Sequence, residues 1–125
     1  MIRVQIPATT ANLGAGFDCM GMALDLWNTF ELRRTGTDAP IIVRNHGEGE
    51  RILPTDETNL VAQILRDRLG EIPGGLEIVC RNDVPCASGL GSSSTATLAG
   101  LVFAKALQLG EVEGGTVAGA LMDRL

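Results

Sequence analysis

Apolar and polar residues alternate along several stretches of the chain, and this pattern predicts β-strands. The alternation in Arg3–Ile6 predicts a first strand, which Pro7 should end because proline has no N–H to donate inside a sheet. A longer alternating run from Gly21 to Leu32 predicts a second strand that pairs back on the first. Further apolar runs predict two short strands at Ile41–Val43 and Leu76–Cys80, and a possible edge strand at Ile52–Leu53.

Apolar residues at helical spacing predict helices in the second half of the chain. One helix should open at Asp56–Asn59 and stop at Gly70, because its apolar residues recur every three or four positions: Leu60, Val61, Ile64, Leu65 and Leu69. Leu98–Leu107 is apolar almost throughout and too long for a strand, so it predicts a buried helix. A third helix is expected from Thr116, and the sequence stops inside it at Leu125. The sequence thus predicts strands and helices in mixed order, and it does not give the order of the strands.

Composition limits the classes of protein that fit. The 125 residues, 45% of them hydrophobic, suit one folded domain, and an aromatic content of 3% requires an aliphatic core. A net charge of −5 with scattered basic residues argues against a nucleic-acid surface. The three cysteines, Cys19, Cys80 and Cys86, lack metal-ligand spacing, and His46 is the one histidine, in a charged loop. We therefore expect free thiols in a cytoplasmic protein, with no membrane-spanning segment and no nucleic-acid partner.

A glycine- and serine-rich loop precedes the apolar helix. Gly89 and Gly91 can adopt positive φ and bring bare N–H groups close to a ligand, and the three hydroxyls of Ser92–Ser94 follow at the predicted helix mouth. Because a helix N-terminus attracts phosphate, this stretch predicts an anion-binding loop. The alternative is a serine N-cap with the glycines serving a turn. A Walker A loop is excluded by the missing lysine, and a dinucleotide fingerprint is disfavoured because Arg81–Ser88 separates the first glycine from the strand.

The segment Pro85-x-x-x-Gly89-Leu90-Gly91-Ser92-Ser93 resembles the phosphate-binding loop of the GHMP kinases. In that family two small residues, usually alanines, follow the paired serines; here they are Ser94 and Thr95. The resemblance implies a loop that wraps the phosphates of ATP, with Ser93 helping to hold Mg²⁺. The implied ATP-binding residues are Pro85, Cys86, Ala87, Ser88, Gly89, Leu90, Gly91, Ser92, Ser93, Ser94 and Thr95.

A second motif resembles the N-terminal signature of the homoserine kinase branch of that family: Pro7-Ala-Thr-x-Ala-Asn12-Leu13-Gly14-x-Gly16-Phe17-Asp18-x-x-Gly21-x-Ala23-Leu24. The resemblance implies transfer of phosphate from ATP to the hydroxyl of L-homoserine, a step toward threonine. It places Asn12 and Asp18 at the substrate, with Asp18 accepting a hydrogen bond from the attacking hydroxyl, and Asn59 near the adenine. The residues themselves also fit a loop in which Asn12 and Asp18 cap backbone groups, and a helix that simply begins at Asn59.

The resemblance implies an α+β fold with a mixed or antiparallel sheet and helices on one face, similar to ribosomal protein S5 domain 2. By this resemblance residues 1–125 are the N-terminal, ATP-binding domain, truncated inside a helix, and the C-terminal domain is absent; a homodimer is left open. Three other functions stay in view: another GHMP-type small-molecule kinase, a non-catalytic nucleotide-binding module, and a Rossmann-like oxidoreductase. The intact Asn12–Asp18 loop argues against the binding module, and the loop-like sequence around Glu111 argues against the oxidoreductase.

Overall fold

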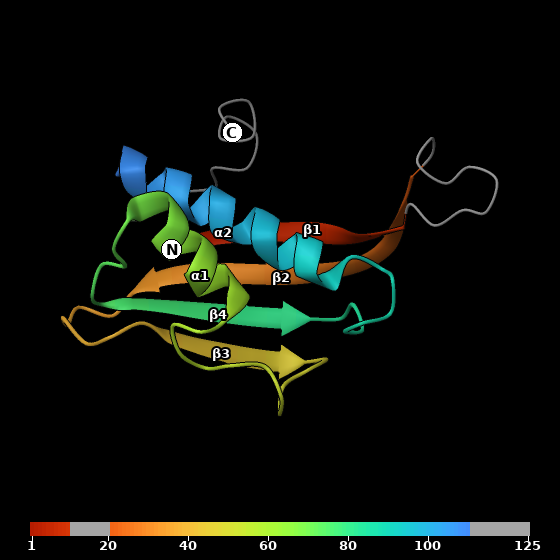
Figure 1. Ribbon diagram of the computed structural model, residues 1–125, viewed down its shortest axis with the longest axis horizontal. Helices are drawn as coiled ribbons and strands as arrows, with labels where there is room; N and C mark the ends of the chain where they lie inside the picture. Colours follow the sequence, from red (N-terminus) through yellow and green to blue (C-terminus); the bar gives the residue numbers. More distant parts are fainter. Residues whose placement is uncertain (11–20, 111–125) are drawn as a thin grey trace.

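A computed structural model of the chain describes residues 1–10 and 21–110 (Figure 1). Within these residues four strands form one sheet in the order β1-β2-β4-β3. The strands are β1 (Ile2–Thr10), β2 (Met22–Arg34), β3 (Ile42–Gly47) and β4 (Leu76–Asn82). β2 pairs antiparallel with both β1 and β4, whereas β3 runs parallel to β4. The prediction that the second strand pairs back on the first is confirmed.

The prediction that Pro7 ends the first strand is wrong. β1 continues through Pro7, which pairs with Trp27, and the register then shifts before Thr9. The strand tolerates this proline because β1 lies at one edge of the described sheet. An edge strand pairs with a neighbour on one side only, so a residue without an N–H need not remove a hydrogen bond between strands. The register shift lies directly before Thr9, whose N–H contacts the loop that joins β4 to the second helix.

The predicted edge strand at Ile52–Leu53 is also wrong. These residues belong to a series of turns in which the N–H groups of Ile52 and Leu53 both donate to the carbonyl oxygen of Gly49, at 3.1 and 2.9 Å. Ile52 is 78% exposed, so its apolar side chain does not mark a buried strand. Next to these turns, the N–H of Val43 in β3 donates to the carbonyl oxygen of Thr55 at 2.9 Å.

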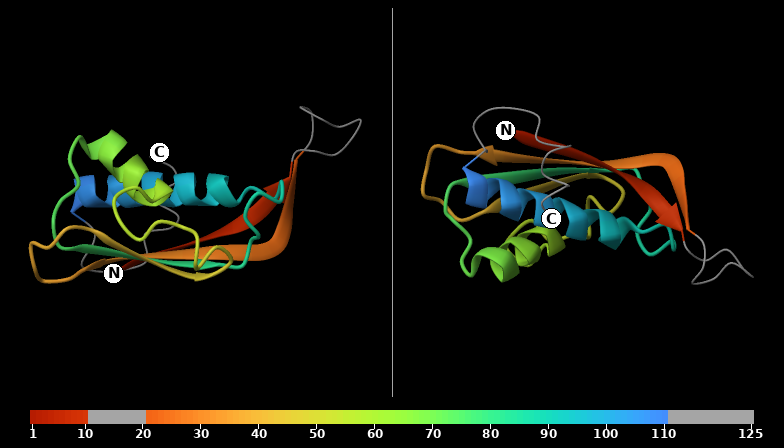
Figure 2. Two further views of the ribbon diagram at one scale, coloured as in Figure 1. Left: turned by 60° about the horizontal axis from the view of Figure 1, so that its bottom comes forward. Right: turned by 90° about the horizontal axis from the view of Figure 1, so that it is seen from above.

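Both described helices, α1 (Leu60–Leu69) and α2 (Ser92–Leu109), cover the same face of the sheet (Figure 2). α1 begins and ends as its sequence predicts: Asn59 caps the N-terminus, and the N–H of Gly70, at a φ of 78°, donates to the carbonyl oxygen of Arg66. α2 is longer at both ends than the predicted Leu98–Leu107. The third helix predicted from Thr116 lies outside the described residues.

The core lies between this sheet face and the two helices, and it is mostly aliphatic, as the composition predicts. Two phenylalanines, Phe30 from β2 and Phe103 from α2, are its largest buried side chains. The helices approach each other closely at Gly100, where an added Cβ would lie 2.7 Å from Cβ of Ile64. The sheet and α2 thus form the packed support of the loop that joins β4 to α2. No helix among the described residues has both the length and the apolar character needed to cross a bilayer.

Candidate functional site

The predicted anion-binding loop occupies residues 83–91, between the end of β4 and the start of α2. Gly91 is the N-cap of α2 in the left-handed conformation, with a φ of 78°, and no side chain caps the helix. The first helical bond runs from the N–H of Thr95 to the carbonyl oxygen of Gly91 at 3.0 Å. The serine N-cap that remained an alternative is therefore not formed, and the N–H groups of the first turn stay available to an anion.

The loop is docked on the end of β1. The N–H of Thr9 donates to the carbonyl oxygen of Leu90 at 2.9 Å. A Cβ on Gly91 would lie 2.8 Å from Oγ1 of Thr9, which is closer than real Cβ contacts allow. Gly91 is thus required twice, once for its positive φ and once for this close approach.

A buried asparagine, Asn28 in β2, ties the two ends of the loop together. Its Oδ1 accepts from the N–H of Val84 at 2.9 Å, and its Nδ2 donates to Oγ1 of Thr95 at 2.9 Å. Sequence reasoning missed this residue, although a signal was present. Asn28 is the polar residue in an alternating series of otherwise apolar residues that includes Leu26 and Phe30. A polar side chain that faces the core needs a hydrogen-bond partner, and Asn28 is buried.

A cavity of about 610 Å³ opens in front of the loop. The loop and the first turn of α2 form one wall, the residues around the start of α1 form a second, and the helix-covered face of the sheet forms the floor. The side chains used below are Asn45, Asn59, Cys80, Cys86, Ser92 and Ser93. The volume suits a small-molecule ligand, and the wall made by α2 favours an anionic group.

The predicted residues Asn12 and Asp18 lie outside the described residues. The loop positions from Pro85 to Ser94 lie together around the N-terminus of α2, and several of them line the cavity. Thr95 differs from its neighbours: it is 1% exposed, and its hydroxyl faces Asn28 and donates to the carbonyl oxygen of Ser92 at 2.6 Å. Ser93 is exposed at the helix mouth.

Asn59 lines the cavity but is occupied by structural bonds. Its Oδ1 accepts from the N–H of Val61 at 3.0 Å, and its Nδ2 donates to the carbonyl oxygen of Pro54 at 3.0 Å. The helix-capping role that the sequence left open is therefore present. One N–H of the Asn59 amide has no bond in this arrangement. The contact with the adenine base, which stays a prediction, would use this N–H.

Asn45 contributes an acceptor near the same wall. Its Nδ2 donates to the carbonyl oxygen of Pro54 at 3.0 Å, whereas its buried Oδ1 has no hydrogen-bond partner. The acceptor on Pro54 fixes the orientation of this amide, because the flipped amide would set two oxygens against each other.

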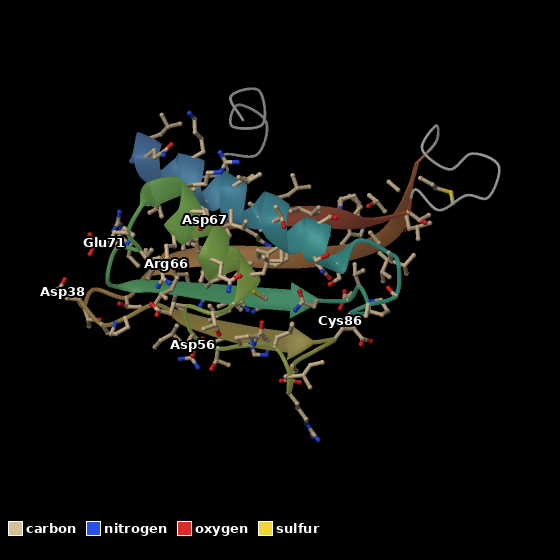
Figure 3. The ribbon with its side chains drawn as sticks, viewed as in Figure 1. Asp38, Asp56, Arg66, Asp67, Glu71 and Cys86 are labelled. Carbon is tan, nitrogen blue, oxygen red and sulfur yellow. The ribbon has the colours of Figure 1, made fainter. Side chains whose placement is uncertain are left out.

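Two titratable groups near the cavity have shifted pKa values. Burial raises the pKa of the Cys80 thiol to about 12, so this thiol stays protonated and unreactive at neutral pH. The pKa of the exposed Asp56 carboxyl is lowered, mainly by hydrogen bonds from the hydroxyl and the N–H of Thr58. Figure 3 places Cys86 beside the carboxyl end of β4, whereas Asp38 and Glu71 lie at the far end of the molecule, away from the anion-binding wall.

The described residues contain no cluster of three or more histidine, cysteine, aspartate or glutamate side chains that could hold a metal ion by themselves. A bare hydroxyl such as that of Ser93 fits Mg²⁺ as one ligand among phosphate oxygens and waters, which is how this ion commonly binds. The donor set of the site therefore fits a metal that arrives with a nucleotide.

A mixed sheet covered on one face by two helices, with a glycine-rich loop at a helix N-terminus, defines a domain of the α+β class. The sequence profile of the GHMP kinases N terminal domain matches residues 58–120, half of the chain. The chain belongs to this family. The prediction of the family and of its fold class is confirmed.

Relatives and solved structures agree with this placement. The chain is 47% identical over 112 residues to a homoserine kinase of Streptomyces avermitilis, a match that covers 87% of this chain and 36% of the relative. A homoserine kinase structure from Cytophaga hutchinsonii superposes with a TM-score of 0.67 at 34% identity, over 90% of this chain and 36% of that one. The mevalonate kinase of Methanococcus jannaschii shares the fold, with a TM-score of 0.62 at 20% identity, over 85% of this chain and 40% of that one. The chain spans little more than a third of the length of these relatives.

Proposed function

We propose that this chain is the nucleotide-binding part of an enzyme that transfers the γ-phosphoryl group of ATP to the side-chain hydroxyl of L-homoserine. The observation that carries the proposal is the N-terminus of α2, which has no side-chain cap and opens on the cavity beside a glycine-rich loop. The identity to curated homoserine kinases supports the choice of acceptor. Magnesium, a cytoplasmic location and the absence of nucleic-acid and membrane partners belong to the same proposal, and the oligomeric state is left to measurement.

The phosphate end of ATP would bind at the mouth of α2. The N–H groups of Ser92, Ser93 and Ser94 precede the first helical bond, so they can donate to phosphate oxygens while the helix dipole favours the negative charge. The Ser93 hydroxyl would hold Mg²⁺, whose contribution is to neutralise charge on the β- and γ-phosphates. The protein's own contribution is to position the phosphates and to supply fixed donors.

The nucleoside end of ATP would extend along the cavity toward the start of α1. The N–H of Asn59 that remains without a bond can donate to a ring nitrogen of the base. The neutral thiol of Cys80 and the apolar residues around it provide an uncharged surface for the base rather than a reactive group. This orientation places the phosphates at α2 and the base at α1, the two walls of the cavity.

The acceptor side of the proposal rests on Asn12 and Asp18, which lie outside the described residues. β1 leads into this segment and β2 leads out of it, and β1 ends where Thr9 binds the phosphate loop. The last described residues before this segment, Thr9 and Thr10, therefore lie beside the proposed phosphate site, which supports an acceptor role for the segment. Asp18 would orient the attacking hydroxyl by accepting its hydrogen bond.

The test is a kinase assay on the intact protein, with O-phosphohomoserine measured directly. We expect ATP-dependent phosphorylation of L-homoserine, and a loss of about 10²-fold or more in kcat for Ser93→Ala, because the metal and the γ-phosphate lose a fixed ligand. Thr97→Ala is the matched control, because its hydroxyl bonds only the carbonyl oxygen of Ser93 within α2. Transfer to mevalonate or a sugar in place of homoserine would favour another GHMP-type kinase. Nucleotide binding without transfer to any alcohol would favour the non-catalytic module.

A further inference from the structure

We propose that Asn28 and Thr95 form a positioning pair that holds the phosphate-binding loop in its ligand-ready shape without touching the ligand. The inference rests on the proposed function, because it assigns a task to residues behind that same site. Asn28 bonds two residues, Thr95 and Val84, which are 67 and 56 positions away from it in the sequence. The pair therefore joins segments that only the fold brings together.

The hydrogen-bond partners of Asn28 determine which way its amide group is oriented. The N–H of Val84 can only donate, so the atom of Asn28 that faces it is Oδ1. The Thr95 hydroxyl gives its single proton to the carbonyl oxygen of Ser92 and accepts from Nδ2 of Asn28. The alternative amide orientation would set the NH₂ group of Asn28 against the N–H of Val84, so that two donors would face each other.

Burial makes these bonds expensive to lose. Asn28 and Thr95 are 0% and 1% exposed, so water cannot replace either partner. A buried donor or acceptor left without a partner costs more free energy than an exposed hydrogen bond contributes. The local structure therefore favours the arrangement in which all three groups, including the Val84 N–H, are paired.

The position of the pair decides what it controls. Val84 begins the loop that leaves β4, and Thr95 lies in the first turn of α2, so Asn28 fixes both ends of the segment between them. The N–H of Thr9 holds the loop a third time, at the carbonyl oxygen of Leu90. With three fixed points, the N–H groups at the mouth of α2 keep their direction before a ligand arrives, which lowers the cost of binding.

The structure also separates Thr95 from the residues that would contact phosphate. Its hydroxyl is fully engaged, and its N–H already makes the first helical bond to Gly91. Thr95 therefore acts through the loop rather than on the nucleotide. The same reasoning makes Asn28 a residue that tunes affinity for the phosphates and not affinity for the acceptor alcohol.

The test compares two isosteric substitutions in α2 of the intact protein. Thr95→Val keeps the shape but removes the acceptor of Asn28, whereas Thr97→Val makes the same chemical change where the hydroxyl bonds only the helix backbone. KM for ATP, KM for homoserine and Vmax are measured for both variants and for Asn28→Ala. A smaller folded fraction lowers Vmax and leaves both KM values unchanged, so a change in one KM reports positioning and not stability.

We expect Thr95→Val and Asn28→Ala each to raise KM for ATP by about tenfold, equivalent to about 1.4 kcal/mol of binding free energy. KM for homoserine should change by less than about twofold, and Thr97→Val should leave both values near those of the wild type. The double variant Asn28→Ala/Thr95→Val should lose no more than Asn28→Ala alone, because the two residues act as one unit. Unchanged KM for ATP in Thr95→Val, or an equal rise in Thr97→Val, overturns the inference.

A second measurement separates failure of this inference from failure of the proposed function. If the wild type phosphorylates no homoserine, the proposed function is wrong, and the affinity of each variant for MgATP is then compared by isothermal titration calorimetry. A weaker affinity in Thr95→Val than in Thr97→Val still supports the positioning pair. Equal affinities, or no binding of MgATP by the wild type, overturn it.

Discussion

Gly100 in α2 offers the sharpest test of how the two walls of the cavity are held together. An ideal Cβ at this position would lie 2.7 Å from Cβ and 2.8 Å from Cγ2 of Ile64, and 3.1 Å from the carbonyl oxygen of Val61. Carbon atoms pack at about 3.5–4.0 Å, so Gly100→Ala requires a shift of roughly 1 Å. Cβ of Ile64 is attached directly to the backbone, and therefore the whole of α1 must move rather than one side chain.

Two opposing effects set the size of the change in stability. Overpacking a core costs about 1–3 kcal/mol, whereas replacing glycine by alanine inside a helix contributes about 1 kcal/mol in the opposite direction. We expect Gly100→Ala to lower the free energy of unfolding by about 1 kcal/mol on balance. The displacement of α1 should also move Asn59, which caps that helix, and so raise KM for ATP.

The assay is urea denaturation of the intact protein, wild type against Gly100→Ala, followed by the ATP dependence of the kinase reaction. The sign of the change in the free energy of unfolding shows whether overpacking or helix propensity dominates at Gly100. A glycine with free space around it would give a variant that is more stable by about 1 kcal/mol, because only the helix propensity would act. A stabilised variant with unchanged KM for ATP would refute the close contact between α1 and α2.

Three further predictions concern single positions. Ala87 has a φ of 54°, so Ala87→Gly should change the free energy of unfolding by less than about 0.5 kcal/mol, whereas Ala87→Val should lower it by about 1 kcal/mol or more in urea denaturation. Gly47→Ala would place a Cβ 2.4 Å from the carbonyl oxygen of Asn82, and it should lower thermal stability by several degrees in calorimetry; an unchanged melting temperature would contradict this geometry. The pKa of Cys80 is raised to about 12 in the fold from 9.0, so its contribution to stability is complete below pH 9 and is lost as the pH rises toward 12. Denaturation between pH 8 and 10.5 should show this loss in the wild type and a smaller one in Cys80→Ala.

The sequence predicts the elements whose patterns are local. The alternation from Gly21 to Leu32, the helical spacing from Leu60 to Leu69 and the punctuation by Gly70 all correspond to observed elements. The Pro7 prediction failed because the cost of a proline depends on whether its strand lies at an edge, and a sequence does not show the order of strands.

The candidate site also contains residues that the sequence predicts and residues that it does not predict. The position of the loop's glycines and serines at the start of α2 was predictable, because their conformational and helix-end preferences are properties of the residues themselves. Asn28 and Thr95 were not assigned their contacts, because the bonds between them depend on β2, β4 and α2 meeting in space. The extent of α2 was underestimated for a related reason: serine and threonine disfavour helix interiors, yet here Thr95 and Thr97 bond back to carbonyl oxygens of the helix.

The hairpin of β1 and β2 has a consequence for the proposed phosphoryl transfer. β1 holds the phosphate loop through Thr9, and β2 holds it through Asn28. The same two strands are joined in sequence by residues 11–20, which include the proposed acceptor-binding side chains. In the proposed kinase, the donor site would thus depend on the same two strands that lead into and out of the segment with the acceptor-binding residues.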